Sequence, residues 1–92
     1  MTSLLIGTCD SYSYLWENFI DMCDRHWLVD CDKIFVSETI ECGNINYKTH
    51  LPGNLEWSDR MISGIKTSKS DYIFFILEDY FFTEEITERE VA

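Results

Sequence analysis

Three apolar runs stand out along the chain, and none of them alternates with polar residues. They cover residues 3–8, 33–37 and 72–77. Continuous apolar runs of this length are typical of strands that are covered on both faces, as in a parallel sheet. The run 72–77 is the most strongly apolar of the three, and we expect it to be the central strand.

Two stretches between these runs have the spacing of amphipathic helices. Between residues 15 and 27, apolar residues recur at steps of three and four, which places one apolar stripe against a core. The polar cluster before this stretch contains Ser11 and Ser13, and we expect one of them to be the helix N-cap. A second stretch of this kind begins at Trp57 and runs to about Lys69.

The remaining segments are a long irregular connection and the end of the chain. Residues 41–54 contain two glycines, a proline and three asparagines, which break regular structure. Within this connection we expect a short edge strand near residues 45–48. Thr83, followed by two glutamates, predicts the start of a third helix, because acidic residues favour the positive end of a helix dipole.

The predicted order of elements is strand, helix, strand, loop, helix, strand, helix. This alternation indicates an α/β fold with a three-layer, Rossmann-like open sheet, mostly parallel, and helices on both faces. Right-handed crossovers would bring the carboxyl ends of all strands to one edge of the sheet. With 92 residues, of which 46% are hydrophobic, the chain can bury one core, so we expect a single domain over residues 1–92.

The charge of the chain excludes several classes of partner. Acidic residues outnumber basic ones by 17 to 7, for a formal net charge of −10. Such a chain repels the phosphates of nucleic acids and of anionic membranes. No apolar stretch approaches the roughly 20 residues of a membrane span, and the N-terminus lacks the basic region of a secretion signal. We therefore expect a cytoplasmic protein with no transmembrane segment and no nucleic-acid partner.

The four cysteines do not form a recognisable metal or redox motif. No two of them stand in a C-x-x-C pair, and no histidine pair lies near them, so their spacing fits no zinc site. In a cytoplasmic chain we expect reduced and mostly buried thiols. No nucleophile and base can be paired from their spacing either, so catalytic residues stay unassigned.

Polar residues follow the first and the last apolar run directly. Thr8, Asp10 and Ser11 come after the first run, and Glu78 and Asp79 end the last. Ligands of open α/β sheets bind at the carboxyl ends of strands where the winding direction reverses. If the two runs are neighbouring strands at this point, their carboxylates converge on one crevice. Mg²⁺ or Mn²⁺ bridging to a diphosphate, or hydrogen bonds from a nucleoside, would then relieve the repulsion between them. Alternatively, the acidic pair simply ends a strand at a solvated edge.

Contacts to phosphate would have to come from groups other than a glycine-rich loop. The segment after the first run lacks the dinucleotide-binding glycines, and the chain has no Walker lysine motif. The backbone amides of a helix N-terminus are one source of such contacts. Arg60, at the start of the second predicted helix, is another, because its guanidinium fork matches two phosphate oxygens. A salt bridge to Asp59 or a neighbouring acid is the alternative role for Arg60.

Three segments resemble GT-A glycosyltransferases, in particular the bacterial enzymes that build capsular or lipopolysaccharide glycans. Residues 57–66 and 70–81 resemble the Arg-bearing helix and the strand that runs into an acidic D-x-D-type motif, and residues 4–12 resemble the first strand and nucleotide loop. The resemblance implies binding of a nucleotide-diphosphate sugar. It places Thr8, Asp10 and Ser11 at the nucleoside and Arg60 at the diphosphate or sugar. It also places Glu78 and Asp79 at the ribose or at a Mn²⁺ or Mg²⁺ ion.

The chain departs from this family in two respects. Tyr80 stands where the second carboxylate of the acidic motif is expected, so either Asp79 takes the metal by a shift of register or the site is independent of metal. GT-A enzymes carry the acceptor site and catalytic base beyond the acidic motif, whereas this sequence ends at Ala92. We therefore expect a donor-binding portion that is inactive alone and needs a second polypeptide to complete the fold. The alternative is a non-enzymatic α/β module for protein interaction.

Overall fold

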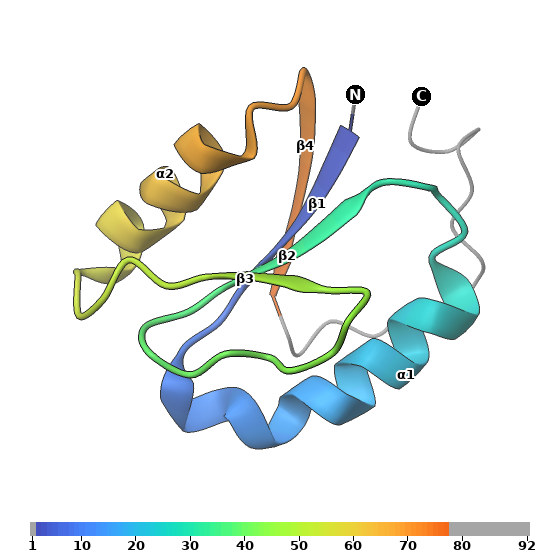
Figure 1. The fold of residues 1–92 in the computed structure, drawn as a ribbon, viewed down its shortest axis with the longest axis horizontal. Coiled ribbons are helices and arrows are strands. Elements are labelled where there is room, and N and C mark those ends of the chain that lie inside the picture. Colours follow the sequence, from blue (N-terminus) through green and yellow to red (C-terminus); the bar gives the residue numbers. More distant parts are fainter. Residues whose placement is uncertain (1, 78–92) are drawn as a thin grey trace.

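The computed structural model describes residues 2–77, which form a four-stranded sheet with two α-helices (Figure 1). In chain order, the elements are β1 (Thr2–Gly7), the 3-10 helix η1 (Asp10–Leu15), α1 (Trp16–His26), β2 (Asp32–Val36), β3 (Lys48–His50), α2 (Trp57–Ser68) and β4 (Tyr72–Leu77). All strand pairs are parallel, which confirms the α/β class. The third helix, predicted from Thr83, lies outside the described residues.

The sheet has the strand order β3-β2-β1-β4. The chain winds outward from β1 through β2 to β3 and then crosses back, by way of α2, to place β4 on the other side of β1. The winding direction therefore reverses between β1 and β4, where Gly7 lies opposite Leu77. The first and last apolar runs are neighbours, which is the condition for a crevice shared by their carboxyl ends.

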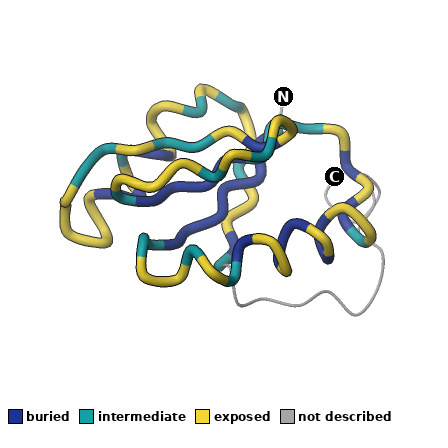
Figure 2. The backbone as a smooth tube through the Cα atoms, turned by 60° about the horizontal axis from the view of Figure 1, so that its bottom comes forward, coloured by how far each residue is buried: buried dark blue, intermediate teal, exposed yellow. Residues whose placement is uncertain are grey.

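Two separate hydrophobic clusters bind the helices to the sheet. On one side, α1 packs its Phe19 and neighbouring residues against Leu4, Ile6 and Phe35. On the other side, the α2 residue Met61 joins a cluster of alternate strand residues, namely Leu5, Ile34 and Val36. Because successive side chains of a strand point to opposite faces, α1 and α2 lie on opposite faces of the sheet. Figure 2 shows the buried positions gathered in the inner strands and along one side of α1.

The start of α1 differs from the predicted capping arrangement. Residues 10–15 form a 3-10 helix in which the Tyr12 amide donates to the Cys9 carbonyl at 3.1 Å, and α1 itself begins only at Trp16. The position before α1 is occupied by Leu15, with no side-chain capping bond. The prediction of a Ser11 or Ser13 N-cap was wrong, because both residues lie inside the preceding tighter turn.

The edge strand β3 is shifted from the predicted residues 45–48 to 48–50. A turn occupies the residues just before it, since the Tyr47 amide donates to the Asn44 carbonyl at 3.0 Å and the Asn46 amide donates to Asn44 Oδ1 at 2.9 Å. This turn directs the Tyr47 ring into the core, where its centroid lies 5.6 Å from that of Phe35. The strand β3, which pairs with β2, therefore begins at Lys48, the residue after this turn.

The most apolar run does not form the centre of the described sheet. Within residues 2–77, β4 is an edge strand, and β1 lies between β2 and β4. The predicted central position of residues 72–77 was therefore wrong for this part of the chain. The consequence is that Phe74 and Phe75, one on each face of β4, remain 39% and 36% exposed.

Candidate functional site

Thr8 follows β1 directly and connects three other elements. Its hydroxyl oxygen accepts a hydrogen bond from Trp16 Nε1 at 2.9 Å, and its amide donates to the Val36 carbonyl at 3.1 Å. Its carbonyl accepts from Arg60 Nη2 at 3.2 Å. The side chain is buried. Thr8 therefore holds the carboxyl end of β1 against α1, β2 and α2, and its predicted contact with a nucleoside stays a prediction.

Asp10 uses its carboxylate to hold the segment that follows β2. Oδ1 accepts from the Ser37 hydroxyl at 3.1 Å and from the amides of Thr39 and Ile40, both at 3.0 Å, while Oδ2 accepts from the Thr39 hydroxyl at 2.5 Å. These bonds, those from Thr39 above all, hold the pKa of Asp10 well below its usual range. The Asp10 amide in turn donates to Glu38 Oε1 at 3.1 Å. The start of η1 and residues 37–40 thus form one hydrogen-bonded unit.

Among the predicted site residues that the structure describes, Ser11 is the one exposed to solvent. Its hydroxyl lies 3.2 Å from Cys9 Sγ, a thiol that is itself half-buried. The side chain stands on the first turn of η1, one residue after Asp10. Ser11 is therefore accessible to a ligand at the end of β1.

Arg60 is a buried cation at the carboxyl end of β1. Only 5% of the residue is exposed. Its Nη1 donates to the Leu55 carbonyl at 3.1 Å and its Nη2 to the Thr8 carbonyl at 3.2 Å. Its Nε is buried and has no hydrogen-bond partner within the described residues. Within residues 2–77, no ion pair joins Arg60 to Asp59, and the described hydrogen-bond partners of the guanidinium are the carbonyls of Leu55 and Thr8.

The structure brings together some of the predicted site residues directly. Thr8 and Arg60 are hydrogen-bonded, although 52 positions separate them in the sequence. Asp10 and Ser11 begin the helix that leaves the same strand end. Glu78 and Asp79 lie outside the described residues, so the predicted convergence of their carboxylates with Asp10 stays a prediction.

Sequence reasoning missed the segment that follows β2. Glu38 and Thr39 contact Asp10 across 28 and 29 positions of sequence. A usable signal was present, because the segment directly follows a predicted parallel strand, and neighbouring parallel strands end at the same edge. The actual pairing, with Gly7 opposite Val36, places residues 8–10 beside residues 37–40. Polar residues after the second run therefore belonged among the candidates.

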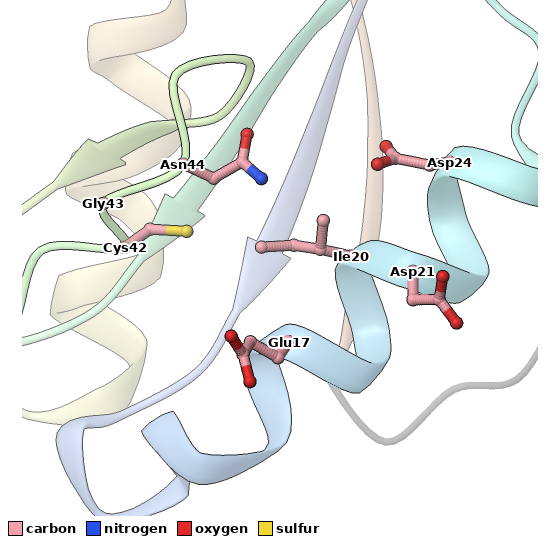
Figure 3. Close-up of a pocket in the computed structure, with 7 residues that line it drawn as sticks. All are labelled: Glu17, Ile20, Asp21, Asp24, Cys42, Gly43 and Asn44. Atoms are coloured by element: carbon pink, nitrogen blue, oxygen red, sulfur yellow. The ribbon is translucent and has the colours of Figure 1, made fainter.

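A shallow groove of about 440 Å³ lies elsewhere, between α1 and the loop before β3 (Figure 3). The lining consists of Glu17, Ile20, Asp21, Asp24, Cys42, Gly43 and Asn44. None of the predicted site residues contributes to it. Its three carboxylates would repel a diphosphate, so this groove is a poor candidate for the predicted ligand.

Metal-ligating side chains do not cluster in the described part of the chain. Within residues 2–77, no group of three or more His, Cys, Asp and Glu side chains is placed to hold a metal ion. The four cysteines are free; Cys23 is buried, and the other three are half-buried. The predicted ligands of Mn²⁺ or Mg²⁺, Glu78 and Asp79, lie outside the described range.

No protein-family model matches the chain, and neither a curated protein nor a solved structure matches it. Open α/β folds host many unrelated functions, so the fold class alone does not select one. Among residues 2–77, no helix is long and apolar enough to cross a membrane. The function must therefore be inferred from the residues at the carboxyl ends of β1 and β2 and from Arg60.

Proposed function

We propose that this chain is the donor-binding portion of a glycosyltransferase of polysaccharide biosynthesis, and that it binds a nucleotide-diphosphate sugar at the carboxyl ends of β1 and β4. The observation that carries the proposal is the buried guanidinium of Arg60 beside the Thr8 carbonyl. Burying a charge without an opposite charge is costly in free energy. Within residues 2–77 no carboxylate forms an ion pair with Arg60, and a diphosphate group would supply a negative charge beside it.

The position of Arg60 supports this proposal. The guanidinium is hydrogen-bonded to the residue that follows β1, at the point where the winding direction of the sheet reverses. Crevices outside the strand ends at such points are the usual ligand sites of open α/β sheets. The Nε of Arg60 is buried and has no hydrogen-bond partner within residues 2–77, and a phosphate oxygen that reached it would satisfy this N–H.

The charge of Arg60 distinguishes this strand end for an anionic ligand. With a net charge of −10, the chain as a whole repels a diphosphate. At this strand end the carboxylate of Asp10 already accepts four hydrogen bonds from residues 37–40, whereas the guanidinium of Arg60 is a buried positive charge. Bound Mn²⁺ or Mg²⁺, held by Glu78 and Asp79, would supply further positive charge to the diphosphate.

Catalysis requires groups beyond those at the carboxyl end of β1. An acceptor hydroxyl needs a base within hydrogen-bond reach, and none of the side chains placed at the end of β1 is assigned this role. We propose that a second polypeptide completes the enzyme and supplies the acceptor site. The chain by itself would then bind the donor without transferring the sugar.

The direct test is calorimetric titration of the purified full chain with UDP-, GDP- and dTDP-sugars, with and without Mn²⁺. We expect one of them to bind. Arg60→Lys keeps the charge but loses the planar fork, and should weaken binding roughly tenfold, or about 1.4 kcal/mol. The matched control is Arg25→Lys on the exposed side of α1, where Arg25 pairs with Asp21, and it should leave binding unchanged.

Two outcomes would contradict the proposal. Absence of binding by all donors, in a sample shown to be folded by circular dichroism, excludes the donor-binding function. Equal binding by folded Arg60→Lys and wild type excludes Arg60 as the diphosphate contact. Asp79→Asn tests the acidic pair separately. Unchanged donor binding by this variant would show that the pair only ends a strand and does not contribute to the donor site.

A second candidate function is a non-enzymatic module for protein interaction. The observation that favours it is that β4 is apolar, partly exposed and an edge strand of the sheet formed by residues 2–77. This function requires no donor binding, so the titration above distinguishes the two candidates.

A further inference from the structure

A hydrogen bond joins His50, the last residue of β3, to Ser63 on α2. Ser63 Oγ lies 2.8 Å from His50 Nε2, although 13 positions separate the two residues in the sequence. Both residues are partly buried, so each keeps some contact with solvent. An imidazole nitrogen at this distance can accept the hydroxyl hydrogen, which is the geometry that activates a serine as a nucleophile.

Both members of this pair are held against Val36 of β2. His50 pairs with Val36 in the sheet, and the His50 carbonyl accepts a hydrogen bond from the Ser37 amide at 3.1 Å. Gly64, the residue after Ser63, packs so closely on Val36 that an added Cβ would lie 2.6 Å from Val36 Cγ2. The hydroxyl and the imidazole are therefore positioned by a helix and a strand rather than by a loop, as a reactive pair requires.

Other serines of the described chain have partners of a different kind. The Ser37 hydroxyl donates to the Asp10 carboxylate at 3.1 Å, and the Ser68 hydroxyl donates to the Ile65 carbonyl at 2.8 Å. A carbonyl oxygen cannot take up the hydroxyl proton, and a carboxylate that already accepts four hydrogen bonds is a weak base. Among the hydrogen bonds described within residues 2–77, that of Ser63 is the one that pairs a hydroxyl with an imidazole.

The pair lies at the edge of the sheet where ligands usually bind. Since β3 is parallel to β2 and β1, His50 ends its strand at the same edge as the carboxyl ends of those strands. The neighbours in sequence are apolar: Leu51 follows His50 and is 40% exposed, and Ile62 precedes Ser63 and is 49% exposed. Within residues 2–77, no Lys or Arg side chain is hydrogen-bonded to the pair, so the net charge of −10 favours an uncharged substrate over a phosphorylated one.

We propose that Ser63 is a nucleophile, that His50 activates it as a general base, and that the substrate is an uncharged ester with an apolar acyl group. As the Ser63 oxygen bonds to the ester carbonyl carbon, Nε2 of His50 takes up the hydroxyl proton. The bond between this carbon and the alcohol oxygen breaks, and the alcohol leaves with the proton from His50. Water then attacks the acyl-serine and gives one proton to His50. The carboxylic acid is released as Ser63 regains that proton.

The described partners of His50 set the expected speed of this reaction. Within residues 2–77, no carboxylate is hydrogen-bonded to the second ring nitrogen, Nδ1, where a carboxylate would hold the imidazole in the tautomer that accepts at Nε2. We therefore expect slow acylation, and only by an activated ester. Because p-nitrophenolate leaves a carbonyl carbon more readily than serine does, the acyl-serine should accumulate with a p-nitrophenyl ester.

Incubation of the full chain with p-nitrophenyl butyrate, followed by peptide mapping with mass spectrometry, tests the proposal. We expect a butyryl group on Ser63, and the mapping separates this adduct from any on the four free cysteines. Ser68 is the internal control, because it lies on the same helix and is also partly buried, but donates to a carbonyl. Ser68 should stay unmodified, and Ser68→Ala should leave the acylation of Ser63 unchanged.

The variant His50→Gln separates catalysis from a merely structural link between β3 and α2. The amide oxygen of glutamine can still accept the Ser63 hydrogen bond but cannot take up its proton. General-base catalysis contributes about 10²–10⁴-fold, so acylation of Ser63 should slow by at least about a hundredfold while the urea midpoint of unfolding stays near that of the wild type. His26→Gln, at the end of α1, is the control and should acylate Ser63 at the wild-type rate.

Three results would overturn the proposal. They are a folded wild-type chain that gains no butyryl group on Ser63, equal labelling of Ser63 and Ser68, and a His50→Gln variant that acylates as fast as the wild type. The first two are measured on the wild-type chain and do not depend on the folding of any variant. Neither a nucleotide sugar nor a metal ion enters these measurements, so their outcome is independent of donor binding.

Discussion

The indole nitrogen of Trp16 donates a hydrogen bond to the hydroxyl oxygen of Thr8 at 2.9 Å, and both side chains are buried. This bond joins the first residue of α1 to the residue after β1. The carbonyl of the same Thr8 receives the Arg60 guanidinium from α2. The end of β1 is therefore the junction at which a helix from each face of the sheet is held.

Replacement of Thr8 by Val should destabilise the protein by about 1–3 kcal/mol, because the shape is kept but the buried Trp16 N–H loses its acceptor. Urea unfolding measures this change. The control is Thr67→Val on an exposed position of α2, which should stay within about 0.5 kcal/mol of wild type. In a Trp16→Phe background the Thr8→Val cost should largely vanish. An equal cost in both backgrounds would show that the hydrogen bond is not its source.

Asp10→Asn should lower the urea midpoint of unfolding at neutral pH. It should also make this midpoint depend less on pH in the acid range. The folded-state pKa of Asp10 is depressed from 3.8 by its bonds to Thr39, Ile40 and Ser37. The carboxylate therefore contributes its stability above pH 3.8, and this contribution is lost as the pH falls from there toward the folded-state pKa. We expect the wild-type midpoint to fall more steeply over this acid range than that of Asp10→Asn. Asp30→Asn, at an exposed position, should follow the wild type, and a parallel fall of all three curves would contradict the prediction.

Gly64→Ala should destabilise the protein by about 1 kcal/mol or more, although alanine is the better helix former. A Cβ at this position of α2 would lie 2.6 Å from Val36 Cγ2 and 3.2 Å from Val36 Cγ1. The gain in helix propensity is about 1 kcal/mol, whereas overpacking against a stiff, buried side chain costs about 1–3 kcal/mol. Thermal unfolding measures the difference, and Thr67→Ala on the exposed side of the helix should instead be mildly stabilising. In a Val36→Ala background, Gly64→Ala should no longer destabilise; if it does, the contact with Val36 is not the cause.

Lys69→Gly should stabilise the protein by roughly 0.5 kcal/mol. Lys69 ends α2 in the left-handed region, with φ 55° and ψ 22°. In this conformation a residue with a Cβ loses about 1 kcal/mol of stability. Glycine avoids this steric cost, and the gain exceeds the extra backbone entropy that glycine loses on folding. Chemical denaturation should show a higher midpoint for this variant. Lys69→Ala removes the same charge but keeps the Cβ, so it should not reproduce the gain. Equal gains in both variants would assign the effect to charge.

Much of the fold could be predicted because burial on both faces leaves a direct trace in the sequence. The apolar runs located β1, β2 and β4 within a residue or so, and the three–four spacing located α1 and α2. The irregular connection was harder, because β3 is set by the turn at Asn44–Tyr47 and by the insertion of the Tyr47 ring beside Phe35, and neither follows from local pattern.

For the candidate site, the sequence singled out Thr8, Asp10 and Arg60 but not how they are used. The Asp10 carboxylate accepts hydrogen bonds from residues 37–40, and the Thr8 hydroxyl oxygen accepts one from the Trp16 indole. These partners lie far away in the sequence and become neighbours only when β2 pairs beside β1. Sequence periodicity reports which face of an element is buried, but not which polar group another element brings to it.

By itself, the sequence determined the class of the fold, the order of strands and helices within residues 2–77, and the acidic character of the chain. The tertiary structure decided that β4 lies at an edge of the described sheet, that the winding reverses between β1 and β4, and that Arg60 is buried beside Thr8. The physical reason is that hydrophobic burial is encoded residue by residue. Strand order and the pairing of polar groups instead depend on contacts between distant segments, which exist only once the sheet has formed.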